Sequence, residues 1–130
     1  MKTTSGIRAG IIILFLCMGA FAQENPCGIT LSRQLPGTYT AGGTVEVQLT
    51  VNAGRPDDIR AIGIHETVPA GWSFASMGPV DGTVPQIGPH AGDLGTLAFA
   101  WFMIPTFPCT FAYTLNVPAE AQGQQPFTGN

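Results

Sequence analysis

Short runs of alternating apolar and polar residues dominate the chain, and they predict β-strands. In Thr44–Asn52 (TVEVQLTVN) every second residue is Val or Leu, and the residues between them are polar or charged. Cys109–Val117 (CTFAYTLNV) also alternates, with Cys, Phe, Tyr, Leu and Val on one face. Successive side chains of a strand point to opposite faces, so a period of two gives each strand one apolar face. Both segments therefore predict strands of a sheet that packs on a core and leaves its other face to solvent.

Four further segments predict strands with less regular patterns: Ile29–Leu35, Ile59–Val68, Trp72–Met77 and Thr96–Met103. Gly- and Pro-rich turns separate them, and residues 78–95 form a long connection rich in both. No segment has the period of 3.6 residues that is typical of a helix, so almost no helix is expected. This pattern predicts an all-β fold, an immunoglobulin-like Greek-key β-sandwich of six to eight strands.

Residues 1–22 have the pattern of a secretory signal peptide. Lys2 and Arg8 supply positive charge, residues 11–18 (IIILFLCM) form an apolar core, and residues 20–22 (AFA) give the small-x-small cleavage pattern. The alternative of an N-terminal membrane anchor is disfavoured, because a spanning helix needs about 20 apolar residues. We therefore expect cleavage after residue 22 and general export, to the periplasm or the outer surface.

A lipoprotein is a second alternative, because Cys17 lies within the apolar run. Leu16 precedes it where a lipid-attachment motif needs a small residue, which argues against lipidation. Cleavage would leave residues 23–130 as a single β-sandwich domain.

Charge restricts the partners of this predicted mature domain. It has three arginines, no lysine and eight acidic residues, a net charge of −5. Such a surface repels nucleic acids and anionic membranes. No other apolar stretch is long enough to span a bilayer. A protein partner or a cell-surface polymer remains open.

Three motifs in a fixed order carry a resemblance to a known family. The strand TVEVQLTVN is followed by residues 65–74 (HETVPAGWSF) and then by residues 111–118 (FAYTLNVP). This order resembles the immunoglobulin-like repeat domains of bacterial and archaeal secreted and cell-surface proteins. Their pattern has an acidic residue before a Leu-Pro-x-Gly-aromatic turn and a late Tyr-Thr strand.

The resemblance covers about residues 37–129 and assigns four structural residues. Glu66 matches the acidic position, Pro69 and Gly71 match the turn, and Tyr113 matches the late tyrosine. It implies a spacer, adhesion or scaffold module, so the expected role is structural or protein-interacting and not enzymatic. Fold alone does not fix function, and the role carried over is an analogy.

The alternation of residues 59–68 also predicts where the side chain of Glu66 lies. It shares strand parity with Ile62 and Ile64, which points its carboxylate inward, and the adjacent His65 points the other way. The two therefore do not form a local acid–base pair. We expect the carboxylate to accept backbone N–H bonds from the turn at Pro69–Gly71.

No catalytic, metal or cofactor motif is present. Neither Ser73 nor Ser76 lies in a Gly-x-Ser-x-Gly elbow, and the His and Cys spacing matches no zinc site. The loop acids could offer oxygens to calcium, but they lack the dense Asp-x-Asp spacing of a calcium loop and are interpreted as solvated. Those acids are Asp57, Asp58, Asp81 and Asp93.

An alternative function is a module that binds a glycan or another small ligand through exposed aromatic side chains. Trp72 and Phe102 are the candidate ligand-binding residues. Core packing is the ordinary role of such residues in a sandwich. Phe102 departs from it, because its parity opposes the apolar face of its strand.

Cys27 and Cys109 remain after cleavage, and an oxidising compartment favours a disulfide between them. Strictly alternating strands would place them at opposite ends of the sandwich, too far apart to bond. An additional strand near Thr83–Ile87 would bring them together. The disulfide and the additional strand are therefore expected together or not at all.

The end of the chain leaves two alternatives. Without a seventh strand, the strand at residues 109–117 has an open edge that a partner or a second copy could complete. Alternatively, Gln125–Thr128 forms a short closing strand.

Overall fold

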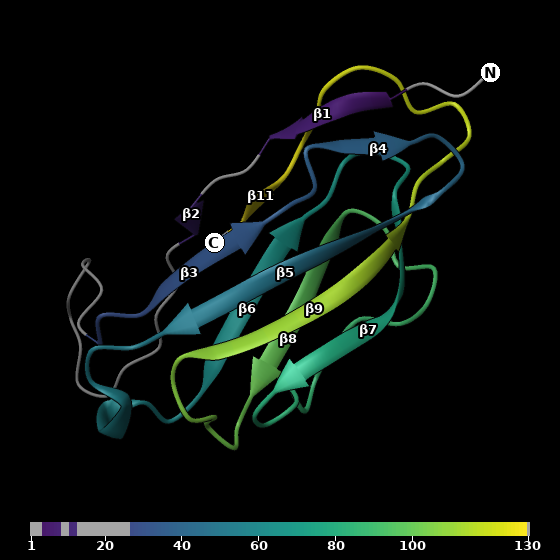
Figure 1. Cartoon of the computed structure of the whole chain (residues 1–130). Helices are drawn as coiled ribbons and strands as arrows, with labels where there is room; N and C mark the ends of the chain where they lie inside the picture. The colour runs from purple at the N-terminus through teal and green to yellow at the C-terminus, as the bar shows by residue number, and fades with distance from the viewer. Residues whose placement is uncertain (1–3, 9–10, 13–26, 130) are drawn as a thin grey trace.

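The computed structural model describes residues 4–8, 11–12 and 27–129 and consists almost entirely of β-strands (Figure 1). The strands are β1 (Thr4–Arg8), β2 (Ile11–Ile12), β3 (Thr30–Gln34), β4 (Thr38–Thr40), β5 (Thr44–Asn52), β6 (Ile62–Thr67), β7 (Ser73–Asp81), β8 (Thr96–Trp101), β9 (Cys109–Asn116), β10 (Gln125–Pro126) and β11 (Thr128–Gly129). Among these residues the one helical element is a 3-10 turn, η1 (Pro56–Asp58). The predicted all-β class is confirmed.

The strands form two main sheets that face each other. One has the order β2-β3-β5-β9-β7, and the other has the order β11-β6-β8. In Figure 1, β6 and β8 run behind β5 and β9. A third small sheet has the order β10-β1-β4. All pairings are antiparallel except that of β1 with β10, an arrangement consistent with a β-sandwich.

Aromatic side chains join the two main sheets in the core. Phe99 and Trp101 on β8 each lie with their ring centroids 5.3 Å from Phe111 on β9. Phe99 also contacts Tyr113, at 5.4 Å. These four side chains are fully buried, as the alternation of β8 and β9 predicts. The inward faces of both sheets therefore close on one core.

The end of β7 differs from the sequence expectation for a local reason. β7 continues to Asp81, four residues beyond the predicted end, with register shifts against β9 between Phe74 and Ser76 and between Met77 and Val80. At Gly78 an added Cβ would lie 3.2 Å from that of Ala112, so glycine permits the close approach of the two strands.

The strand predicted for residues 109–117 is not an edge. β9 lies between β5 and β7, so the hypothesis of an open edge there is wrong. The alternative of a closing strand at Gln125–Thr128 holds in part, because residues 125–129 form two short strands, β10 and β11, in two different sheets. β11 pairs with β6, with Thr128 opposite Thr67.

The predicted disulfide between Cys27 and Cys109 is also wrong, because Cys109 is a free, buried thiol. Val51 on β5 lies opposite Leu31 on one side and Cys109 on the other. β5 thus separates β3 from β9, which places them about 10 Å apart. Bonded cysteines need Cα atoms within about 7 Å.

The connection between β7 and β8 explains why strand counting failed. The connection doubles back along β7, where the amide of Phe74 donates to the carbonyl of Asp93. Strand directions therefore do not simply alternate along the chain, and β3 and β9, both antiparallel to β5, run in the same direction. The additional strand expected at Thr83–Ile87 reduces to an isolated bridge between Ile87 and Ala100.

Two strands lie within the predicted signal peptide. β1 pairs with β4 and β10, and β2 pairs with β3. The predicted cleavage site and Cys17 lie outside the described residues. Among the described residues, no helix is long and apolar enough to cross a membrane.

Candidate functional site

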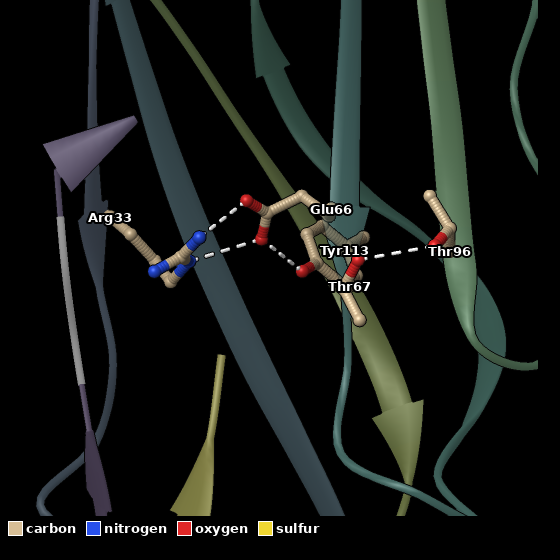
Figure 2. Close-up of polar contacts among 5 residues, drawn as sticks. All are labelled: Arg33, Glu66, Thr67, Thr96 and Tyr113. Atoms are coloured by element: carbon tan, nitrogen blue, oxygen red, sulfur yellow. Dashed lines mark hydrogen bonds and ion pairs between the residues drawn. The ribbon is translucent and has the colours of Figure 1, made fainter. Parts of the chain in front are cut away.

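A buried polar cluster joins the two main sheets and contains two of the four residues assigned by resemblance (Figure 2). Arg33 on β3 donates from Nε to Glu66 Oε1 at 3.0 Å and from its second terminal nitrogen to Oε2 at 2.6 Å. Tyr113 on β9 donates its hydroxyl to Oε1 at 2.8 Å. The side chains of Arg33 and Glu66 are both fully buried. This cluster therefore ties β3 and β9 of one sheet to β6 of the other.

The expectation that Glu66 binds the Pro69–Gly71 turn is wrong. Its inward parity is confirmed, but the carboxylate reaches across the sandwich because Arg33 and Tyr113 point at it from the facing sheet. The turn closes on its own backbone, where the Trp72 amide donates to the Pro69 carbonyl at 3.1 Å. Gly71 has φ of 83°, a conformation that favours glycine over L side chains.

Electrostatics within the cluster favour a neutral Tyr113. Burial raises the pKa of its hydroxyl well above the ordinary value, and the charge of Glu66 raises it further, while Arg33 partly opposes both. Two opposite charges buried together and held by three hydrogen bonds compensate each other. The cluster thus links the two sheets inside the core, and both carboxylate oxygens of Glu66 accept hydrogen bonds within it.

The Arg33 guanidinium also lies against the C-terminal segment. Its carbon lies 5.8 Å from the centroid of the Phe127 ring, a cation–π contact. Phe127 in turn packs edge-on against Trp72, at 5.7 Å. One terminal nitrogen of Arg33 and the indole nitrogen of Trp72 are buried without a hydrogen-bond partner within the described part of the chain.

The candidate ligand-binding residues have opposite positions. Trp72 is fully buried between Tyr39 and Phe127, so the prediction that it meets a ligand is wrong. Phe102 is 60% exposed. β8 ends at Trp101, so strand parity does not account for this exposure, and Met103, which the alternation places on the apolar face, is 68% exposed. Trp72 lies directly after the turn at Pro69–Gly71 and directly before β7. A platform of two exposed aromatic rings is therefore not formed by these residues.

Phe102 belongs to an exposed apolar surface built by two segments. We call it the Phe102 surface and define it by Val84, Ile87, Phe102 and Met103, all of which are exposed. The side chain of Gln86 joins the segments, because its Oε1 accepts the amides of Phe102 at 2.7 Å and Met103 at 2.9 Å. The surface is thus held in place by hydrogen bonds.

Further contacts fix the same loop beneath this surface. Ile87 and Ala100 exchange two backbone hydrogen bonds, at 3.1 and 2.9 Å. The indole nitrogen of Trp101 donates to the carbonyl of Thr83 at 2.8 Å. Residues 82–92 and 94–119 contain no Asp, Glu, Lys or Arg. The result is an apolar surface on a hydrogen-bonded support, and the two segments that build it carry no charge.

The loop acids are distributed over three segments. Asp57 and Asp58 belong to η1, Asp81 ends β7, and Asp93 accepts the His90 amide at 2.8 Å. Within the described residues, no group of three or more His, Cys, Asp or Glu side chains could hold a metal ion.

Sequence reasoning did not single out Arg33 or the Phe102 surface as a unit. Arg33 shares parity with Leu31, and that alternation already pointed an arginine into the core opposite an inward Glu66. The Phe102 surface depends on where residues 82–95 fold, for which no local pattern exists. No protein-family model, no curated protein and no solved structure matches this chain.

Proposed function

We propose that this chain is an exported, non-enzymatic module of immunoglobulin-like Greek-key type, which binds a protein partner at the cell surface or in the envelope through the Phe102 surface. The observation that carries the proposal is the exposure of Phe102 and Met103 side by side, at 60% and 68%. Contiguous exposed apolar side chains on a soluble domain mark interaction sites. The two segments that build the surface contain no charged residue, which suits the centre of a protein interface, where charged residues are depleted.

A protein partner is favoured over a glycan. Glycan platforms stack sugar rings on aromatic faces, and Phe102 is the one aromatic residue among the four side chains of the Phe102 surface. Aliphatic and thioether side chains make up the rest, and methionine is frequent at interfaces that adapt to protein partners. The Arg33–Glu66–Tyr113 cluster serves the scaffold and holds the two sheets in one arrangement.

The test is co-sedimentation of the exported protein with envelope fragments from the cells that produce it. The Phe102→Ser, Met103→Ser double variant removes both apolar side chains and keeps the two backbone amides that Gln86 binds. Loss of two central apolar contacts worth about 2 kcal/mol weakens binding about 30-fold. Leu94→Ser is the matched control, because Leu94 is 61% exposed and lies outside the Phe102 surface.

Binding by the wild type and by Leu94→Ser, with loss in the double variant, is the expected result. Equal binding by all three proteins would exclude the Phe102 surface as the contact. No binding by the wild type to any envelope fraction would overturn the proposed role.

A further inference from the structure

The free edges of the two main sheets are unequally protected against pairing with another chain. Unpaired strand edges invite such pairing unless bulges, prolines, charges or covering segments prevent it. β7 has two register shifts and contains Pro79, and the outward backbone of Phe74 is bonded to Gly92 and Asp93. β8 is covered at Ala100 by Ile87. These two edges are protected by the domain itself.

Among the described residues, β3 lacks such protection along its length, and Pro36 lies only at the junction where β4 continues the edge. β3 pairs with β5 over five consecutive residues without a register shift. Its outward side chains, those of Thr30, Ser32 and Gln34, are exposed and uncharged. The segments that cover this edge are β1 and β2, which both belong to the predicted signal peptide.

The pairing of β1 and β2 shows what the edge accepts. Thr4 lies opposite Thr40 on β4, and Ile12 lies opposite Leu31 on β3. Residues 4–6 pair antiparallel with residues 38–40, and residues 11–12 pair antiparallel with residues 31–32, with a one-residue offset between the two pairings. The offset falls around Pro36 and Gly37, where the edge bends between its two strands. A single extended segment can follow the whole edge.

We propose that, once the signal peptide is removed, the edge formed by residues 31–40 binds an extended segment of another exported chain by β-strand addition. This inference rests on the export that is part of the proposed function. It adds a second binding surface, separate from the Phe102 surface. Backbone hydrogen bonds would supply the affinity, as in other complexes that add a strand to an open edge.

Charge and shape indicate the chemistry of the added strand. The mature domain has a net charge of −5, so a second copy is repelled, and an uncharged or basic segment is preferred. A second copy would also have to pair through its own edge, which is bent at Pro36 and fixed within a folded domain. Such an edge is less able than a flexible segment to follow the offset. The added strand is therefore an extended, flexible, uncharged or basic stretch of about nine residues.

The experiment uses the exported protein, purified as cells release it, and a synthetic peptide of residues 4–12 (TSGIRAGII) as the probe. Intact mass first establishes whether the protein begins at Gln23. Hydrogen exchange, resolved to residues 30–40, is then measured with and without the peptide. The control peptide carries Ser5→Pro and Ile11→Pro, which remove backbone donors and disfavour a strand.

The expected result is a protein that begins at Gln23 and a peptide that slows exchange at residues 31–40 by tenfold or more. The control peptide should have no effect. Ser32→Lys, which places a charge on the edge, should weaken peptide binding, whereas Gln48→Lys on β5, inside the same sheet, should not.

Four results would overturn the inference. An exported protein that retains residues 1–22 would fill the edge with its own leader. In a second result, residues 31–40 of a monomer are protected from hydrogen exchange without any peptide. In a third, the two peptides have the same effect on exchange. A native mass of two chains with the edge protected would assign the edge to a second copy. None of these results affects envelope binding through Phe102, so the two proposals fail separately.

Discussion

Replacing Glu66 with glutamine removes the negative charge that compensates the buried Arg33 guanidinium. Three hydrogen bonds converge on the carboxylate, from Nε and a terminal nitrogen of Arg33 and from Tyr113, at 2.6–3.0 Å. The amide of glutamine keeps the shape but directs an NH₂ group toward these donors. Removal of one partner from a buried ion pair costs about 3–5 kcal/mol, because the remaining charge is left without compensation.

The same reasoning predicts that removing the whole cluster costs far less. In the triple variant Arg33→Met, Glu66→Leu, Tyr113→Phe, no buried charge or hydroxyl of the cluster remains. Apolar replacements of similar volume are often neutral or stabilising, so the triple variant should lie within about 2 kcal/mol of the wild type. Tyr113→Phe alone removes one hydrogen bond to a charged group and should cost about 1.5–3 kcal/mol.

The assay is guanidinium chloride unfolding of the exported protein, followed by tryptophan fluorescence, since both Trp72 and Trp101 are buried. A loss of about 3–5 kcal/mol is a large part of the total for a domain of this size. If Glu66→Gln is too unstable to purify, the comparison of Tyr113→Phe with the triple variant still applies. A cost below about 1 kcal/mol for Glu66→Gln, or a triple variant as unstable as the summed single changes, would refute the reasoning.

Three further predictions concern single residues. The pKa of Tyr113 is raised in the folded state, so its contribution to the free energy of unfolding is complete below the unfolded pKa of about 10. Above that pH the contribution is lost, by at most about 1.4 kcal/mol per pH unit. Unfolding free energies measured from pH 8 to 11 should therefore fall less steeply in Tyr113→Phe than in the wild type. Gly71→Ala should cost about 1–2 kcal/mol because φ is 83°, whereas Gly63→Ala on β6, with no atom within 4 Å of the added Cβ, should be nearly neutral in the same unfolding assay. The Cys109 thiol should resist alkylation in the native protein, since burial and the charge of Asp81 raise its pKa. It should react once guanidinium unfolds the chain, without any reductant. Native reactivity equal to that of the unfolded chain would contradict its burial.

Period-two patterns predicted the main strands well. β5 has the predicted bounds, and β9 ends one residue early, because alternation there is uninterrupted and each strand has one buried face. At the end of β8 the alternation was no guide, because the strand stops at Trp101 and both Phe102 and Met103 are exposed. Local pattern was informative wherever a residue's face of the sheet decided its environment.

Predictions that depended on the order of strands in space failed. The direction of β9 relative to β3 depends on how residues 82–95 double back, and neither periodicity nor turn chemistry encodes that path. The partner of Glu66 likewise depends on which strands face β6. An inward arginine and an inward glutamate on separate strands were visible in the sequence, but only the packing of the sheets shows that they meet.

The central claim is that the Phe102 surface contacts a protein partner, and photo-crosslinking in the producing cells tests it most directly. A photoreactive phenylalanine replaces Phe102 in one variant and Leu94, equally exposed but outside the surface, in another. The account predicts a discrete protein adduct from position 102 that is absent from position 94. No adduct from position 102, or the same adducts from both positions, would contradict it.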